Sequence, residues 1–354
     1  MAKVLVKGNE ALAEAAIRSG CKLFFGYPIT PQTEVSAYMA KKLPKIGGCF
    51  LQAESEVSAI NMVYGAGGSG KRVMTSSSSP GISLKQEGIS YIAGADVPCV
   101  IVNIVRGGPG LGGIQPAQSD YFQAVKGGGH GDYHLIVLAP SSIQEMVDLT
   151  SLAFNLADEY RMPVMIMGDG MLGQMMEPVE FPEEDEGAVY AEKGWAANGT
   201  KMERKHNIIN SLYIEAKELE DTILERQKKY DVIVANEARC EEMNTEDADI
   251  ILVAYGTTAR IAKTAMMKAR EKGIKVGLIR PITLWPFPTE NFKKHADGKK
   301  KFLCVEMSMG QMVEDVKLAL DCKNSVDFFG RTGGIVPTPN EILAKIDEIS
   351  GGAF

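Results

Sequence analysis

The chain has 354 residues, of which 45% are hydrophobic and 23% are charged, and its formal net charge is -7 at pH 7. This length exceeds one ordinary hydrophobic core and fits two α/β domains. The composition is typical of a globular protein, and the negative charge argues against partners such as nucleic acid or an anionic membrane. No long apolar run resembles a signal peptide or a membrane span, so a cytoplasmic location is expected.

The cysteines show no CxxC pair, which is the spacing typical of metal and cluster ligands. Several of them fall in apolar, strand-like runs. We therefore expect buried thiols and no cluster ligands at positions 21, 49, 99, 240, 304 and 322.

The N-terminal region predicts a helix, a strand and a stiff turn. Asn9 is expected to cap a helix over 10–19, and a strand follows over 23–27. The strand continues into Tyr27-Pro-Ile-Thr-Pro31, where two prolines restrict the backbone before the next helix. Thr30 therefore lies in a rigid loop, where it either caps that helix or contacts a ligand.

Two carboxylates stand where a short apolar stretch, Cys49 to Gln52, changes into a helical pattern. The stretch is typical of a buried parallel strand, and the helix is expected to begin near Ser55. Glu56 then lies in the first helical turn, two residues after Glu54. A glutamate in this turn can simply interact with the exposed N–H groups and the helix dipole, or it can reach a bound molecule.

The next strand ends in a run of hydroxyl side chains. Residues 72–76 predict a strand that continues into Thr75-Ser-Ser-Ser-Ser-Pro-Gly81, and a helix follows towards Ala93. In open α/β sheets, ligands bind at the carboxyl ends of the strands, and hydroxyls near a helix start suit anions or polar rings. The cluster either caps a turn or lines a binding site.

An arginine occupies the equivalent place after a β-branched strand over 99–105. It opens the run Arg106-Gly-Gly-Pro-Gly-Leu-Gly-Gly113. A guanidinium matches a carboxylate with two parallel hydrogen bonds, so Arg106 either pairs with a neighbouring acid or binds a carboxylate ligand. The spacing Gly108-x-Gly110-x-Gly112 loosely resembles a dinucleotide fingerprint. No helical pattern follows at once and no strand-ending acid appears about 20 residues later, which argues against that interpretation.

Strands over 135–138 and 163–168 and a helix over 142–160 complete the first α/β pattern. The run Gly168-Asp169-Gly170 resembles the start of the magnesium–diphosphate motif of thiamine enzymes, but the paired asparagines expected about 25 to 30 residues later are missing, and Asn198 stands alone. Asp169 is therefore expected to be a loop residue.

From residue 177 the sequence becomes rich in proline and acid, and a bridging helix is expected over 206–230. A second α/β pattern follows, with strands over 249–254, 275–279 and 301–305, and Glu306 at the end of the last strand could be a site residue or a cap. The runs Ala254 to Thr257, Leu284 to Pro288 and Val305 to Ser308 resemble the C-terminal domain of transketolase-like enzymes. We expect domains at 1–180 and 246–354, joined by a linker and helix over 181–245.

The stretch from Phe50 to Gly70 resembles the glutamate-containing segment of pyrimidine-binding domains in thiamine diphosphate enzymes. In those domains, a glutamate at a helix start touches the aminopyrimidine ring of the cofactor. Glu56 matches better than Glu54 by its spacing to Gly65. The expected fold is thus an α/β pyrimidine-binding domain, doubly wound with a mainly parallel sheet, plus a smaller transketolase C-terminal-like α/β domain.

The run Tyr27 to Pro31 is similar to that of 2-oxoacid:ferredoxin oxidoreductases, whose threonine lies beside the oxoacid. The run Thr75 to Gly81 and the strand-ending Arg106 also match this family. The chain resembles its alpha subunit, nearest to the branched-chain type. The resemblance implies Glu56 as the catalytic residue and Thr30 and Arg106 as substrate-binding residues, with cofactor contacts from Tyr27, Pro28, Ile29, Glu56, Ser76 and Ser77.

The implied reaction is the oxidative decarboxylation of a 2-oxoacid to acyl-CoA and CO2 in anaerobic metabolism, with ferredoxin as the electron acceptor. Thiamine diphosphate would be shared with a beta subunit that carries the diphosphate and Mg²⁺ motif. The [4Fe-4S] clusters would lie on partner subunits, gamma and ferredoxin-like subunits would be further partners, and coenzyme A would be a substrate. Other classes stay open, namely a non-redox thiamine enzyme component or a structural nucleotide-binding subunit.

The choice of oxoacid rests on the side chains near the glycine loop. Leu111, Ile114 and Phe122 offer apolar surface, which favours 3-methyl-2-oxobutanoate, because each buried methylene contributes about 0.8 kcal/mol. A 2-oxoglutarate enzyme must pair a second carboxylate with a cation, for which Lys126 and His130 are available. Pyruvate is a further alternative.

Overall fold

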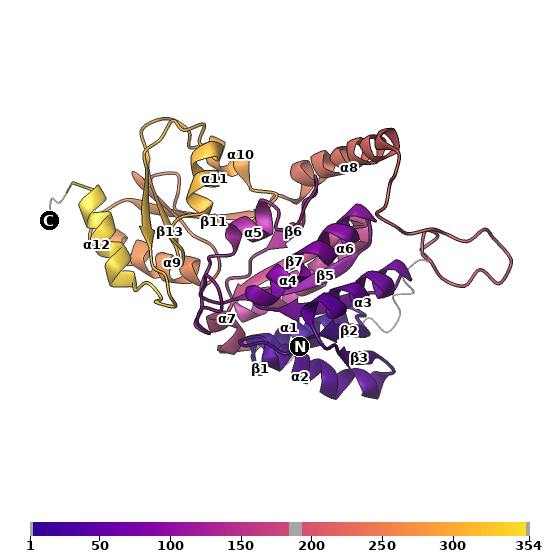
Figure 1. Cartoon of the computed structure of the whole chain (residues 1–354). Helices are drawn as coiled ribbons and strands as arrows, with labels where there is room; N and C mark the ends of the chain where they lie inside the picture. The colour runs from indigo at the N-terminus through magenta and orange to yellow at the C-terminus, as the bar shows by residue number, and fades with distance from the viewer. Residues whose placement is uncertain (1–2, 184–192, 352–354) are drawn as a thin grey trace.

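The computed structural model describes residues 3–183 and 193–351. Alternating strands and helices form two α/β units that lie side by side (Figure 1). The first unit runs from indigo to magenta, and the second from orange to yellow. The predicted fold class is confirmed, because each unit is built on a mainly parallel sheet.

The first unit has a seven-stranded sheet in the order β12-β6-β7-β5-β4-β2-β3. All neighbouring pairs are parallel except β12 and β6. The inner strands are runs of aliphatic residues, as expected of strands covered on both faces. The strands are β2 (Leu23–Gly26), β3 (Cys49–Gln52), β4 (Val73–Ser77), β5 (Cys99–Val105), β6 (Ile136–Leu138), β7 (Pro163–Asp169) and β12 (Thr283–Trp285).

Helices cover both faces of this sheet. On one face α3 packs against α4, and alternate strand residues such as Ile101 and Met165 join their core. On the other face α1 packs against α6, over Val100 and Val164. The helices are α1 (Gly8–Arg18), α2 (Thr33–Lys42), α3 (Glu56–Gly68), α4 (Pro80–Gly94), α5 (Tyr121–Val125), α6 (Ile143–Tyr160) and α7 (Gly170–Gln174), with a 3-10 helix η1 (Leu43–Ile46).

The second unit has a five-stranded sheet in the order β14-β13-β10-β11-β9, in which only β9 is antiparallel to its neighbour. Its strands are β9 (Cys240–Met243), β10 (Ile250–Val253), β11 (Val276–Pro281), β13 (Lys301–Glu306) and β14 (Val326–Gly330). Its helices are α9 (Gly256–Glu271), α10 (Thr289–Lys293), α11 (Met312–Ala319) and α12 (Pro339–Ile349). Separately, β1 (Val4–Lys7) pairs antiparallel with β8 (Met176–Val179). The domain boundaries expected from the sequence stay a prediction.

The bridging helix begins and ends later in the chain than the predicted range 206–230. Helix α8 spans Ala216–Glu237, whereas residues 207–214 are not helical and alternate between half-buried and exposed side chains. Ile209 packs beside Gly68 at the end of α3, while Ile208 and Leu212 are exposed. The apolar spacing suggested that this segment is helical, but it lies against the first unit without regular secondary structure.

Three local predictions are wrong. Asn9 does not cap α1 but donates hydrogen bonds from Nδ2 to the Pro31 carbonyl oxygen and the Glu34 carboxylate, at 2.8 Å each. The strand β3 is not buried, because it forms the edge of the sheet. For the same reason the thiol of Cys49 is exposed, and Cys322 is exposed as well, while the thiols of the other cysteines are buried or partly buried.

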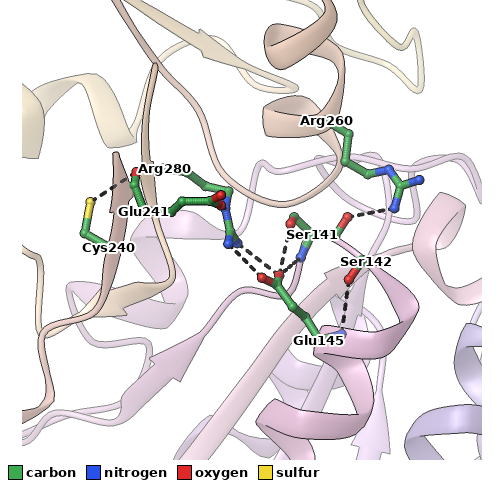
Figure 2. Close-up of polar contacts among 7 residues, drawn as sticks. All are labelled: Ser141, Ser142, Glu145, Cys240, Glu241, Arg260 and Arg280. Atoms are coloured by element: carbon green, nitrogen blue, oxygen red, sulfur yellow. Dashed lines mark hydrogen bonds and ion pairs between the residues drawn. The ribbon is translucent and has the colours of Figure 1, made fainter. Parts of the chain in front are cut away.

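Charged side chains join the two units at the start of α6 (Figure 2). Arg280 on β11 is only 4% exposed and donates to both carboxylate oxygens of Glu145, at 3.0 and 2.7 Å. Its Nε also donates to Glu241 at 2.7 Å. Beside this pair, Arg260 on α9 donates to the Ser141 carbonyl oxygen at 3.0 Å. These ion pairs and hydrogen bonds hold the second sheet against the first unit.

No helix within residues 3–183 and 193–351 is both long and apolar enough to cross a membrane.

Replacing Arg280 with Met should lower the free energy of unfolding by about 2 kcal/mol, because two carboxylates lose their shared guanidinium while remaining partly buried. Lys217→Met is the matched control, since the ion pairs of Lys217 with described residues are exposed and lie within α8. Urea denaturation of the full chain measures both. A change below about 0.5 kcal/mol for Arg280→Met would contradict the proposed joint between the units.

Candidate functional site

The residues singled out from the sequence gather at the carboxyl edge of the first sheet. Thr30 follows β2, Ser77 ends β4 and Arg106 follows β5. Glu56 follows the edge strand β3, at the first position of α3. Because parallel strands end at the same edge, the turns after them form one surface where a ligand can bind.

Arg106 is buried, with 6% of its surface exposed, but it has no ion pair within the described parts of the chain. Its Nη1 donates to the Thr30 carbonyl oxygen at 2.9 Å and its Nη2 to the Leu111 carbonyl oxygen at 3.0 Å. Its Nε is buried and has no hydrogen-bond partner among the described residues. A buried positive charge that lacks a carboxylate partner is costly, so this position suits a bound anion.

The loop that carries Thr30 is held on its inner side by a residue that the sequence did not mark. Gln32 is fully buried; its Nε2 donates to the Tyr27 carbonyl oxygen at 3.2 Å, and its Oε1 accepts from the Ser76 hydroxyl at 2.5 Å. Tyr27, Pro28 and Thr30 have exposed side chains and Ile29 is half-buried. The loop is therefore fixed on its inner side and open on its outer side.

The structure separates the two carboxylates near the start of α3. Ser55 is the N-cap residue, and its hydroxyl accepts from the Ser58 backbone N–H at 3.2 Å. Glu54 is exposed and accepts a hydrogen bond from the Ser58 hydroxyl. Glu56 is only 5% exposed. Since Ser55 already caps the helix, the Glu56 carboxylate is left for another role.

The Glu56 carboxylate lies against the first turn of α4. A Cβ atom added to Gly81 would lie 2.7 Å from Glu56 Oε1 and 2.1 Å from Ser77 Oγ, so only glycine fits there. The hydroxyls of Ser77 and Ser78 are buried and have no hydrogen-bond partner within the described residues. Unpaired buried hydroxyls are rare and often indicate that a ligand or water completes the site.

Ser79 connects the turn after β4 to the turn after β5. Its backbone has φ 22° and ψ -82°, which is a strained conformation for a residue with a side chain. Its hydroxyl accepts from the Arg106 backbone N–H at 3.0 Å, and its own backbone N–H donates to Asn103 Oδ1 at 3.1 Å. These hydrogen bonds stabilise the strained backbone of Ser79. They also fix the position of Arg106 relative to the serines that follow β4.

Lys85 is a second residue that the sequence reasoning missed. It is fully buried on the inner face of α4, and its Nζ donates to the Thr75 hydroxyl at 2.7 Å and to the Ser76 carbonyl oxygen at 3.1 Å. Burial lowers the pKa of Lys85 to about 7, against the opposing effect of the Glu56 charge. The spacing Gly81, Lys85, Ile89 on the buried face of the predicted helix could have indicated this position.

The glycine loop after Arg106 is packed against the second unit. A Cβ atom at Gly334 would lie 2.3 Å from the Gln115 Cβ, so the two segments touch closely. Gln118 is buried; it donates to the Tyr255 carbonyl oxygen at 2.9 Å and accepts from the Met307 backbone N–H at 3.0 Å. The second unit therefore holds the loop that carries Arg106. The first helix after this loop is α5, which begins only at Tyr121, and this does not fit a dinucleotide fingerprint.

Two acids outside this site serve as helix caps. The prediction of Asp169 as a loop residue is wrong, because it ends β7, and its Oδ1 accepts from the backbone N–H groups of Met171 and Leu172 at 2.9 and 3.2 Å. Burial raises the pKa of Asp169. Glu306 is fully buried and accepts backbone hydrogen bonds at the start of α11, including Met312 N–H at 3.1 Å, which agrees with its interpretation as a cap.

Lys126 and His130 were considered as partners for a second carboxylate of the substrate. Each of them already contacts another residue of this chain. Lys126 forms an ion pair with Asp315 on α11. His130 lies edge-on to Tyr91, with 6.3 Å between the ring centroids. The charge of Lys126 is thus already matched by a carboxylate of the second unit.

The sequence matches known families and relatives. The family "Pyruvate flavodoxin/ferredoxin oxidoreductase, thiamine diP-bdg" matches residues 14–245, and "Pyruvate:ferredoxin oxidoreductase core domain II" matches residues 248–342. Ketoisovalerate oxidoreductase subunit VorB of Methanothermobacter marburgensis is 52% identical, over 99% of each chain. The 2-oxoglutarate synthase subunit KorA of Methanothermobacter thermautotrophicus is 38% identical, over 96% of this chain and 97% of the relative.

A solved structure agrees with the fold of both units. It is the 2-oxoglutarate:ferredoxin oxidoreductase from Magnetococcus marinus with 2-oxoglutarate, coenzyme A and succinyl-CoA bound, at 28% identity and a TM-score of 0.86. The match covers 98% of this chain and 65% of that chain, slightly less than two thirds. Together with the two family matches, it shows that the chain belongs to the pyruvate flavodoxin/ferredoxin oxidoreductase family, that is, to the 2-oxoacid:ferredoxin oxidoreductases.

Proposed function

We propose that this chain is the subunit of a 2-oxoacid:ferredoxin oxidoreductase that binds the oxoacid and the pyrimidine side of thiamine diphosphate. The proposed reaction converts 3-methyl-2-oxobutanoate and coenzyme A to the acyl-CoA and CO2, with ferredoxin as the electron acceptor. The observation that carries the proposal is the buried guanidinium of Arg106, which has no carboxylate partner within the described residues and lies against Thr30. The 52% identity to a ketoisovalerate oxidoreductase subunit supports the branched-chain substrate.

The residues present fit the pyrimidine ring of thiamine diphosphate. The ring has both donors and acceptors, and the site offers the Glu56 carboxylate together with two buried hydroxyls that have no partner within the described chain, those of Ser77 and Ser78. Gly81 leaves open the space that a Cβ would fill between Glu56 and Ser77. The turn formed by Tyr27, Pro28 and Ile29 would cover the ring from the β2 side, and Ser76 would hold that turn through Gln32.

When bound, thiamine diphosphate supplies an electron sink for the acyl carbanion that is left by decarboxylation. Glu56 would hold and exchange a proton at its carboxylate with a pyrimidine ring nitrogen, which requires a buried carboxylate in a fixed position. Arg106 would bind the oxoacid carboxylate through its free Nε, and Thr30 would lie beside it. Because Arg106 is anchored at both Nη atoms, little side-chain entropy is lost when the substrate binds.

The side chain of the substrate would meet an apolar wall in the glycine loop. Leu111 is 83% exposed and Ile114 is 58% exposed, so both can be covered by a ligand or by a neighbouring chain. Lys126 already pairs with Asp315, which disfavours a second substrate carboxylate at this position. We therefore favour a branched aliphatic oxoacid over 2-oxoglutarate, the substrate class named by the more distant relative.

Partner chains would complete the active site. The relatives are named as subunits, and the outer side of the site is open, with the edge strand β3 and the side chains of Tyr27 and Thr30 exposed. We propose that a beta subunit docks there and supplies the diphosphate and Mg²⁺ motif. Gamma and ferredoxin-like subunits would carry the [4Fe-4S] clusters. Because coenzyme A and ferredoxin are carriers of cytoplasmic metabolism, the proposed location of the complex is the cytoplasm.

Glu56→Gln keeps the shape of the side chain, but the amide cannot shuttle a proton as the carboxylate can. In the assembled complex, we expect kcat/KM for the oxoacid to fall by at least about 100-fold, the usual contribution of a positioned acid or base. Glu54→Gln is the matched control and should retain near-native turnover, because Glu54 is exposed. Loss of turnover in Glu54→Gln with native turnover in Glu56→Gln would show that the wrong carboxylate was chosen.

The isolated chain should bind thiamine diphosphate with Mg²⁺ weakly or not at all, because only the pyrimidine side is present. Titration calorimetry on the purified chain and on the assembled complex measures the difference. Tight binding to the isolated chain would refute the shared site.

Substrate preference is measured as kcat/KM for 3-methyl-2-oxobutanoate, 2-oxoglutarate and pyruvate on the assembled complex, with ferredoxin or a viologen dye as acceptor. We expect the branched oxoacid to be preferred, and Lys126→Met to leave the order unchanged. Preference for 2-oxoglutarate that disappears in Lys126→Met would overturn the substrate assignment and leave the family reaction in place.

A further inference from the structure

Lys85 is a buried amine, and the geometry of α4 places it near Glu56. Gly81 and Lys85 are one turn apart on α4 and share a face of the helix. The Cβ position of Gly81 lies 2.7 Å from Glu56 Oε1. Side chains on a helix point towards its N-terminus, so the Lys85 stem extends towards Glu56.

The end of the side chain is fixed on the adjacent strand. Lys85 Nζ donates to the Thr75 hydroxyl and the Ser76 carbonyl oxygen, directly before Ser77, whose hydroxyl also borders Gly81. These two acceptors are neutral, and Lys85 has no ion pair within the described residues. A buried ammonium is costly without a negative charge nearby, and Glu56 is the carboxylate that acts on it.

Two titratable groups face Lys85 from the elements packed around it. Glu56 lies at the start of α3, and the thiol of Cys99 lies at the start of β5. Cys99 is fully buried, and burial raises its pKa to about 12, so it remains a neutral thiol near pH 7. The remaining contacts, from β4, are the hydroxyl and carbonyl groups of Thr75 and Ser76. Among these groups, Glu56 alone can carry a charge at neutral pH.

We propose that Lys85 is a positioning residue for Glu56, whose positive charge attracts the Glu56 carboxylate and directs it to the ligand side of the α3–α4 contact. The role rests on the proposed function of Glu56, but the electrostatic coupling between the two side chains can be tested without it. Lys85 does not touch the substrate. It acts through the position of the Glu56 carboxylate.

The burial that lowers the pKa of Lys85 to about 7 makes this coupling sensitive to pH. Below this value the ammonium form dominates and attracts the Glu56 carboxylate. Above it the amine is neutral and this attraction is lost. Removing the Glu56 charge must therefore shift the titration of Lys85 to lower pH.

The first experiment measures Lys85 itself by NMR on the full chain with ¹³Cε-labelled lysine. The Lys85 signal is assigned by its absence in Lys85→Met, or in Lys85→Gln if the first variant does not fold. We expect a titration near neutral pH, and Glu56→Gln should shift it to lower pH by about one unit, since it removes the negative charge that favours the ammonium. Lys229→Met is the matched control, because Lys229 is another largely buried lysine that pairs with Asp96 on a distant surface. It should leave the Lys85 titration unchanged.

The second experiment measures kcat/KM against pH on the assembled complex. In the native complex kcat/KM should decline as the pH rises through the Lys85 titration, because the neutral amine no longer attracts the Glu56 carboxylate, and this limb should be absent in Lys85→Met. Lys229→Met should keep the native profile.

A Lys85 titration near pH 10, or one that does not respond to Glu56→Gln, would overturn the coupling. Lower turnover in Lys85→Met that leaves the limb near neutral pH in place would reduce Lys85 to a packing residue. Both outcomes are distinct from a failure of the proposed function, which would appear as native turnover in Glu56→Gln.

Discussion

The structure of the site depends on one unmatched positive charge at the carboxyl edge of a parallel sheet. Arg106 is buried and is held at both Nη atoms by backbone carbonyl oxygens, while its Nε has no partner within the described residues. Neutral carbonyls orient a guanidinium but do not balance its charge. A carboxylate ligand would supply that balance, and the planar guanidinium suits such a ligand.

Much of the remaining fold serves to keep this charge in place. Ser79 adopts a strained backbone and ties the turn after β4 to the Arg106 backbone. Gln118, in the segment after the glycine loop, donates a hydrogen bond to the Tyr255 carbonyl oxygen of the second unit. Arg280 joins the second sheet to Glu145 on α6. The smaller unit therefore contributes to the site. It holds the loop whose Leu111 carbonyl oxygen orients Arg106.

The sequence predicted those features that depend on neighbouring residues. The strand endings at Ser77 and Arg106 and the helix start at Ser55 carry local signals, namely apolar runs, glycines and a capping serine. Because parallel strands end at a common edge, these local signals are sufficient to place the polar residues that follow them on one surface.

Features that depend on distant contacts were missed or misjudged. The burial of Gln32 arises from contact between the loop after β2 and Ser76 on β4, which no short window of sequence reveals. Residues 207–214 have helical apolar spacing but lie against the first unit without regular secondary structure. Asn9 had the residue type of a helix cap, yet its amide hydrogen-bonds to Pro31 and Glu34, because tertiary partners can override local preference.

The central claim is that Arg106 binds the carboxylate of the substrate. Titration calorimetry can test it on an assembled complex carrying Glu56→Gln, in which slow turnover leaves the ligand intact. With Arg106→Met added, the affinity for 3-methyl-2-oxobutanoate should fall by about 100-fold, whereas the affinity for its methyl ester, which lacks the charge, should stay nearly constant. Unchanged binding of the oxoacid, or an equal loss for acid and ester, would contradict the claim and leave Arg106 with a structural role only.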